Sequence, residues 1–184
     1  MDVLAGNRKS HIEMGNLYFW TATINGWIHL LHSDAMKLEI IQSLQWLAQK
    51  KLVAVYAYVI MPNHLHFIWA IKDSNGKESP HGSLLKYTAH RFRSLLYATD
   101  KETLKKYEVA ANNKRHEFWQ RDSLAVKIFT RDFLLQKITY IHNNPVAKNW
   151  QLAGHPAEYR FSSASYYETG GDEFGILTHI SEVY

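Results

Sequence analysis

The 184-residue chain contains no cysteine, only four prolines and nine glycines. The absence of cysteine excludes disulfide bonds, thiolate metal sites and a cysteine nucleophile. The chain also has little excess charge of either sign. Its 21 Lys and Arg residues are nearly balanced by 17 Asp and Glu residues, so the net charge is only +4. Such a charge allows nucleic-acid binding without indicating it. The composition, 46% hydrophobic and 21% charged, is typical of a globular protein and excludes a disordered or coiled-coil chain.

Long apolar runs are absent as well. The longest, Leu52 to Met61, is about half as long as a membrane span. Residues 1–10 lack the apolar segment of a signal peptide. We therefore expect a cytoplasmic protein with no membrane segment. The length favours one domain over 1–184, with a core at about 17–150 and a C-terminal tail at 151–184.

Aromatic and β-branched residues indicate four strands. They are dense at 17–24, 53–60 and 64–71. The second and third of these segments should form a hairpin, because only Met61-Pro62-Asn63 separates them. A fourth strand is expected within 117–128. The strands account for most of the apolar residues that could form a core.

Apolar residues at helical spacing indicate three helices, at about 34–51, 83–98 and 130–140. The last should begin at a Thr130 cap and stop before Asn144-Pro145. The order strand, helix, strand, strand, helix, strand predicts an α+β protein with the ferredoxin-like (split βαβ) arrangement. We expect an antiparallel sheet with helices on one face, plus an additional C-terminal helix carrying Tyr140.

His64 and His66 lie two residues apart on a predicted strand. Residues at this spacing project to the same face, while Leu65 and Phe67 point to the other. Because the apolar pair suits a core, the histidines should lie on a surface or in a cleft. Two neutral imidazoles held by one strand can bind a divalent cation. Two partly exposed histidines without a function remain the alternative.

Tyr140 and Asn144 are four residues apart and should share one helical face, which Lys137 and Phe133 extend. A phenolic oxygen can attack phosphorus when a cation assists it. An amide oxygen beside two imidazoles would suit Mg²⁺ or Mn²⁺. The alternative is a helix that buries a tyrosine and ends before a proline.

Both segments resemble a known family. The run Tyr58-Val-Ile-Met-Pro-Asn-His-Leu-His66 resembles the HUH motif of single-tyrosine transposases, and Tyr140-Ile-His-Asn-Asn-Pro-Val resembles their tyrosine helix. The likeness is strongest to REP-associated tyrosine transposases and related insertion-sequence transposases, and it covers most of 17–167. Relatives often continue after Asn-Pro-Val with a basic residue and Ala-Gly, whereas this chain has Ala-Lys-Asn-Trp150.

The resemblance implies a divalent-metal-dependent endonuclease and strand transferase that cuts single-stranded DNA near hairpins. Tyr140 would form a 5′-phosphotyrosine intermediate. His64 and His66 would hold Mg²⁺ or Mn²⁺, with Asn144 as third ligand. Some relatives are dimers that build each site from two chains, so the resemblance also allows a homodimer.

Several residues are candidates for holding DNA through phosphate contacts or base stacking. They are Lys86, His90, Arg91, Arg93, Trp119 and Lys137. A solvated charged face and a core tryptophan are the alternatives for these residues. Two other functions compete with the transposase reading: a domesticated DNA-hairpin-binding protein without catalysis, and a metal hydrolase that activates water.

Overall fold

The computed structural model describes residues 12–111 and 114–183. Residues 1–10, where the sequence predicts no signal peptide, lie outside the described residues. None of the helices in the two described ranges is long and apolar enough to cross a bilayer. The strands are β1 (Leu17–Thr23), β2 (Val53–Ile60), β3 (His64–Ile71), β4 (Glu108–Ala111), β5 (Lys114–His116) and β6 (Leu124–Lys127). The α-helices are α1 (Asp34–Gln49), α2 (Pro80–Thr99), α3 (Lys101–Lys105), α4 (Arg131–Asn143) and α5 (Ala164–Thr169). Short 3₁₀ helices lie at Asn25–Trp27, Leu30–His32, Pro156–Glu158 and Ile180–Glu182.

Four strands form an antiparallel sheet in the order β2-β3-β1-β6. With α1 between β1 and β2, and α2 between β3 and β6, this is the split βαβ arrangement. The predicted fold class and the β2–β3 hairpin are therefore confirmed. The register of β1 against β3 places Thr21 opposite His66 and Thr23 opposite His64.

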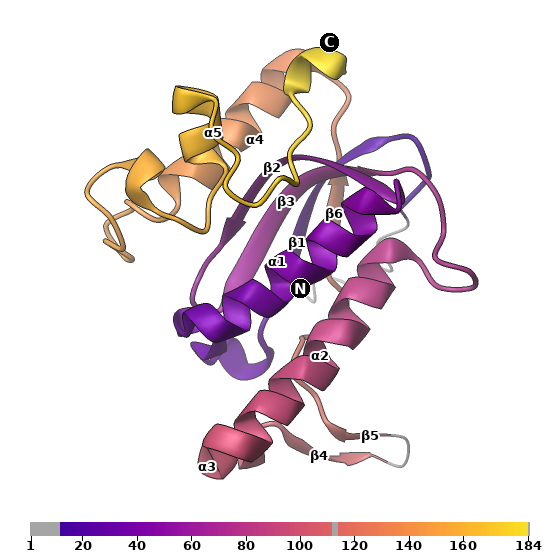
Figure 1. Ribbon diagram of the computed structural model, residues 1–184, viewed down its shortest axis with the longest axis vertical. Coiled ribbons are helices and arrows are strands. Elements are labelled where there is room, and N and C mark those ends of the chain that lie inside the picture. Colours follow the sequence, from indigo (N-terminus) through magenta and orange to yellow (C-terminus); the bar gives the residue numbers. More distant parts are fainter. Residues whose placement is uncertain (1–11, 112–113, 184) are drawn as a thin grey trace, which may run out of the picture.

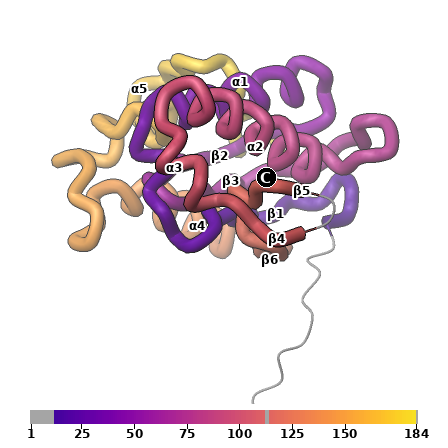
Figure 2. Tube along the Cα trace, turned by 90° about the horizontal axis from the view of Figure 1, so that it is seen from below, coloured from indigo at the N-terminus to yellow at the C-terminus, as the bar shows by residue number. Residues whose placement is uncertain are grey.

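Helices cover both faces of this sheet (Figures 1 and 2). On one face, Trp20 and Trp69 stack with ring centroids 4.9 Å apart, and the Trp20 ring lies 6.4 Å from that of His81 on α2. On the other face α4 contacts β2 and β3. All eight residues of β3 are consequently buried. Of the two expected positions for His64 and His66, a surface or a cleft, the open surface is excluded because α4 lies across this face and both residues are buried.

The predicted caps and the apolar stripe of α4 are present. Thr130 accepts a hydrogen bond from the Phe133 backbone N–H at 3.2 Å, which caps the first turn. Three side chains on one stripe pack against the sheet and are buried: Leu134, Ile138 and Ile141. Asn144 still has helical dihedral angles, but the helix cannot continue because Pro145 has no N–H to donate and its ring would clash with the Ile141 carbonyl. This docking fixes which face of α4 turns away from the core.

α2 begins at Pro80, three residues before the predicted start. Ser79 Oγ accepts a hydrogen bond from the Gly82 N–H at 3.2 Å, and proline fits the first turn because its missing N–H is not needed there. After α2, the charged segment forms α3 and the β4–β5 hairpin. Together with the end of α2 they project beyond the sheet in Figure 1. We call residues 90–111 and 114–116 the arm.

The C-terminal segment runs along the outer edge of β2. The Ile60 N–H donates to the Phe161 carbonyl at 2.9 Å, and the Thr178 N–H donates to the Val55 carbonyl at 2.8 Å. The Tyr159 hydroxyl adds a hydrogen bond to the Ile60 carbonyl at 2.8 Å. Residues 151–183 thus complete the hydrogen bonding of the edge strand.

Candidate active site

The two strand histidines form the centre of the candidate site. Their ring centroids are 4.8 Å apart, and the residues are only 8% and 6% exposed. Phe19 of β1 stacks on His66 at 5.0 Å, and Trp150 lies 5.8 Å from His64. The pair therefore sits at the floor of a covered site rather than on a free surface.

Oxygen partners hold both rings at Nδ1. The His64 Nδ1–H donates to Asn63 Oδ1 at 2.7 Å, and the Asn63 amide nitrogen donates to the Trp27 carbonyl at 3.3 Å. This fixes the amide orientation, so His64 carries its proton on Nδ1 and its Nε2 lone pair is free. His66 Nδ1 shares a 2.7 Å hydrogen bond with Thr21 Oγ1. Such Nδ1 contacts are typical of histidines that bind metal through Nε2.

The electrostatics keep the two rings neutral. Burial lowers the pKa of His64 to about 4. Burial is also the main reason that the pKa of His66 falls to about 3, followed by the charges of His64 and Lys137. His66 Nε2 is buried and has no hydrogen-bond partner among the described residues. Neutral imidazole is the form that binds a metal cation. The unpartnered Nε2 of His66 is therefore available as a metal ligand.

Tyr140 meets the histidines within a single chain. Its ring centroid lies 5.4 Å from that of His66 and 6.0 Å from that of Phe19, while the residue is 50% exposed. Lys137 Nζ lies 5.6 Å from the Tyr140 ring centre, as expected for neighbours on one helical face. No second copy is needed to bring the phenol and the imidazoles together.

Asn144 is the predicted metal ligand without a hydrogen bond to the histidine pair among the described residues. It follows Tyr140 by one turn and is 8% exposed, but its side chain forms no hydrogen bond with either imidazole among the described residues. In the same described ranges no group of three or more His, Cys, Asp or Glu could hold a metal. A cation on the histidine pair would therefore need a ligand of another type, such as an amide or a phosphate oxygen.

Four partners of the site escaped the motif-based prediction. Thr21 and Asn63 orient the rings, and Phe19 and Trp150 pack against them. Pairing of the first strand with the His66 strand would have indicated Thr21, because cross-strand neighbours share a face. Trp150 lies in the stretch that departs from the relatives' pattern, and nothing in its spacing indicates a position beside His64.

Two of the predicted DNA-contact residues have protein partners in the structure. Trp119 is 7% exposed and donates to Thr88 Oγ1 at 3.0 Å, so its ring belongs to the core and cannot stack on a base. Arg91 binds both carboxylate oxygens of the buried Glu39, at 2.9 and 3.0 Å. That bidentate pair ties α2 to α1 and uses the Nε–H and one Nη2–H of the guanidinium.

The other predicted DNA contacts lie in three places. Lys86 pairs with Glu78 at 2.6 Å on the surface. Lys137 lies beside Tyr140, with Nζ 4.7 Å from the Phe19 ring centre. His90 and Arg93 line a groove on the arm. The predicted DNA-contact residues of α2 are close in the sequence, but their side chains have different surroundings in the structure.

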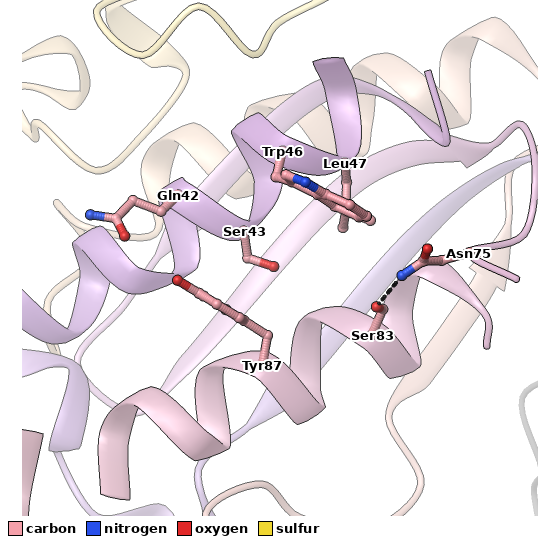
Figure 3. Close-up of a pocket in the computed structure, with 7 residues that line it drawn as sticks. All are labelled: Gln42, Ser43, Trp46, Leu47, Asn75, Ser83 and Tyr87. Carbon is pink, nitrogen blue, oxygen red and sulfur yellow. Dashed lines mark hydrogen bonds between the residues drawn. The ribbon is translucent and has the colours of Figure 1, made fainter. Parts of the chain in front are cut away.

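A cleft of about 420 Å³ separates α1 from α2 (Figure 3). Trp46 and Tyr87 line it with half-exposed rings, and Asn75 donates to Ser83 Oγ at 2.8 Å across its floor. Its described lining contains no imidazole, carboxylate or ammonium group. Because α1 and α2 cover the face opposite α4, this cleft is separate from the histidine pair, and its chemistry suits neither a metal nor a phosphate.

The buried histidines make stability depend on pH. Burial lowers the pKa of His142 to about 4, as it lowers those of His64 and His66. Unfolded histidines have a pKa near 6.5, so below that pH the unfolded chain binds protons that the folded chain does not. We expect the free energy of unfolding to fall from pH 7 to pH 5, by at most about 1.4 kcal/mol per pH unit for each such histidine.

Urea denaturation of the metal-free protein at both pH values measures this loss. H142F should shrink the pH dependence, because one titrating ring is gone. Equal stability at pH 5 and pH 7 would contradict the neutral, buried histidines described above.

Comparison with known proteins agrees with the fold. No protein-family sequence model matches the chain, and no curated protein matches it. A solved candidate transposase from Deinococcus radiodurans R1 is 16% identical, with a TM-score of 0.42 over 78% of this chain and 97% of that one. A solved REP-associated tyrosine transposase, bound to a REP hairpin, is 17% identical and has a TM-score of 0.57 over 95% of this chain and 90% of that one. The chain thus has the fold of a REP-associated tyrosine transposase, as the resemblance of its motifs implied.

Proposed function

We propose that the chain is a transposase-like enzyme that cuts and rejoins single-stranded DNA beside a hairpin, with Tyr140 as nucleophile. The observation that carries this proposal is the half-exposed Tyr140, whose ring centroid lies 5.4 Å from that of the buried His66 in the same chain. The solved neighbour of the same fold binds a REP hairpin, which supports hairpin DNA as the partner.

The reaction would exchange one phosphodiester for another. Tyr140 Oη attacks the phosphorus atom, the P–Oη bond forms and the P–O3′ bond breaks. The phenolic proton passes to solvent, and the departing oxygen takes up a proton to become a 3′-OH. The 3′-OH of another strand end then attacks the 5′-phosphotyrosine, which forms a new phosphodiester and restores the phenol. No nucleotide cofactor is consumed.

The residues around Tyr140 have separate tasks in this scheme. His64 and His66 would hold Mg²⁺ or Mn²⁺ through Nε2, with Asn144 as a proposed third ligand; the orphaned His66 Nε2 fits that assignment. When bound, such a cation polarises a phosphate oxygen. The Lys137 ammonium, on the same face as Tyr140, would attract the phosphate and offset charge on its oxygens.

A labelled-DNA assay tests the proposal directly. The protein is incubated with Mn²⁺ and a pool of hairpin-bearing single strands with randomised flanks, labelled at either end. We expect a denaturation-resistant protein adduct with 3′-labelled DNA only, because the phosphotyrosine retains the downstream fragment. The 5′-labelled strand should appear as a shorter free product.

The other outcomes identify the competing functions. Hairpin binding without adduct or cleavage would favour the non-catalytic DNA-binding protein. Cleavage without any adduct would favour a hydrolase that activates water. An adduct with the 5′-labelled strand would overturn the assigned polarity of attack.

A further inference from the structure

A second cluster of cationic side chains lies on the arm, outside the candidate active site. α2 and the β4–β5 hairpin enclose a groove of about 270 Å³. Five of its lining residues are basic or imidazole side chains: His90, Arg93, Lys114, Arg115 and His116. Two separate elements, α2 and β5, thus direct positive charge or N–H donors into one concavity.

His116 is an unsatisfied group in this groove. Its side chain is 6% exposed, and Nε2 has no hydrogen-bond partner among the described residues. The nearest carboxylate oxygen, on Glu108, lies 3.9 Å away, which is too far for a hydrogen bond. Buried polar atoms normally have a partner, and this nitrogen has none although His116 lines both the groove and the neighbouring pocket that Glu108 lines.

Arg93 is the unpaired cation of the groove. Arg115 pairs with Glu108 at 3.4 Å, and Lys114 pairs with Glu117. Arg93 is exposed and forms no ion pair within 12–111 and 114–183. Its guanidinium therefore keeps the planar set of N–H donors that matches two oxygens of one phosphate.

The groove lies at the same end of the sheet as the histidine pair. Phe118 lines it, and the Phe118 carbonyl accepts a hydrogen bond from the Asn25 N–H at 2.7 Å, just beyond β1. The Gln120 N–H donates to the Thr23 carbonyl at 2.8 Å, and Thr23 is opposite His64 in the register. The root of the arm is therefore anchored beside the end of β3 that carries His64. One nucleic acid could occupy both sites across this end of the molecule.

We propose that this groove binds the sugar–phosphate backbone of a DNA hairpin stem. Arg93 would bind one phosphate through two N–H groups, and a rotation of the buried His116 ring would bring Nε2 to the same or the next phosphate. The identity of the ligand as hairpin DNA rests on the proposed function, whereas the phosphate chemistry rests on the groove alone. Backbone contacts position the stem without reading its sequence, and they weaken as salt displaces them.

The test measures binding in EDTA, so that catalysis plays no part. Fluorescence anisotropy of a labelled hairpin is recorded from 50 to 300 mM salt for the full chain and for R93Q. We expect the affinity of R93Q to be about tenfold lower at low salt. The slope of log Kd against log salt should fall by about one unit, since one phosphate contact is lost. K50Q, which removes an exposed cation after α1, is the charge-matched control and should bind like the wild type.

Each other outcome has a defined meaning. An R93Q protein that is folded but keeps the wild-type affinity and salt slope would overturn the groove as a phosphate site. If R93Q loses as much affinity for an unpaired strand of the same length as for the hairpin, the stem is not the ligand of the groove. If the wild type forms no covalent adduct but R93Q still lowers the salt slope, strand transfer fails and the groove stands.

Discussion

Replacement of Tyr140 by phenylalanine is expected to abolish the covalent protein–DNA adduct and to lower cleavage by about a thousandfold or more. The variant keeps the ring that lies beside His66 and Phe19 and removes only the attacking oxygen. That hydroxyl has no hydrogen-bond partner in the described ranges, and the residue is half exposed, so stability should change by less than about 0.5 kcal/mol. The measurement is adduct formation on 3′-labelled DNA, together with hairpin affinity in EDTA.

Tyr97 offers a matched control for this experiment. It is 60% exposed on α2, and Lys101 Nζ lies 4.8 Å from its ring centre, much as Lys137 lies near Tyr140. Y97F should form the adduct at the wild-type rate. A persistent adduct in Y140F would remove Tyr140 from its proposed role, whereas loss in both variants would point to a general effect on folding or binding.

Replacement of His66 by phenylalanine is the second change with a large expected effect. A phenyl ring preserves the packing against Phe19 and Tyr140 but has no nitrogen for a cation. We expect cleavage to fall by about a hundredfold or more. The wild type should gain about 2.7 kcal/mol of stability when Mn²⁺ is at 100 times its dissociation constant, and H66F should lose that gain. Thermal unfolding with and without Mn²⁺ measures the gain independently of catalysis.

His142 provides the control for the metal experiment. It is also a neutral, largely buried histidine, but its Nε2 contacts Ser163 Oγ at 2.8 Å and its ring lies 5.3 Å from that of Tyr167. H142F should therefore keep the stabilisation by Mn²⁺. Wild-type cleavage that is unaffected by EDTA would disprove the metal site, and so would a full Mn²⁺ response in H66F.

Local patterns predicted the strands and the helix that carry the site. Alternation along 64–71 places His64 and His66 on one face, and this holds because β3 is paired on both sides and the irregularity in its pairing with β2 lies farther along, opposite Ile68 and Trp69. The Thr130 cap and the stop at Asn144 predicted the bounds of α4, since both act within one turn of helix. Features that depend on neighbours in the chain were therefore readable from the sequence.

Features that depend on residues far away in the sequence could not be predicted from local patterns. The burial of Trp119 follows from its hydrogen bond to Thr88, 31 residues earlier, and the role of Arg91 follows from Glu39 on another helix. The helix predicted at 83–98 leaves Pro80 outside, although proline also suits the first turn of a helix after a capping serine. In each case the residue type allowed two environments, and tertiary packing selected one.

The outer margin of the sheet limits how copies of this chain could assemble. Residues 161–163 and 177–178 already occupy the hydrogen-bonding groups of β2, so a second subunit cannot extend the sheet there without displacing them. The opposite margin ends in the four-residue β6, which offers few backbone groups to a partner. Continuous intersubunit sheets are thus disfavoured, and any pairing of copies must rely on side-chain surfaces.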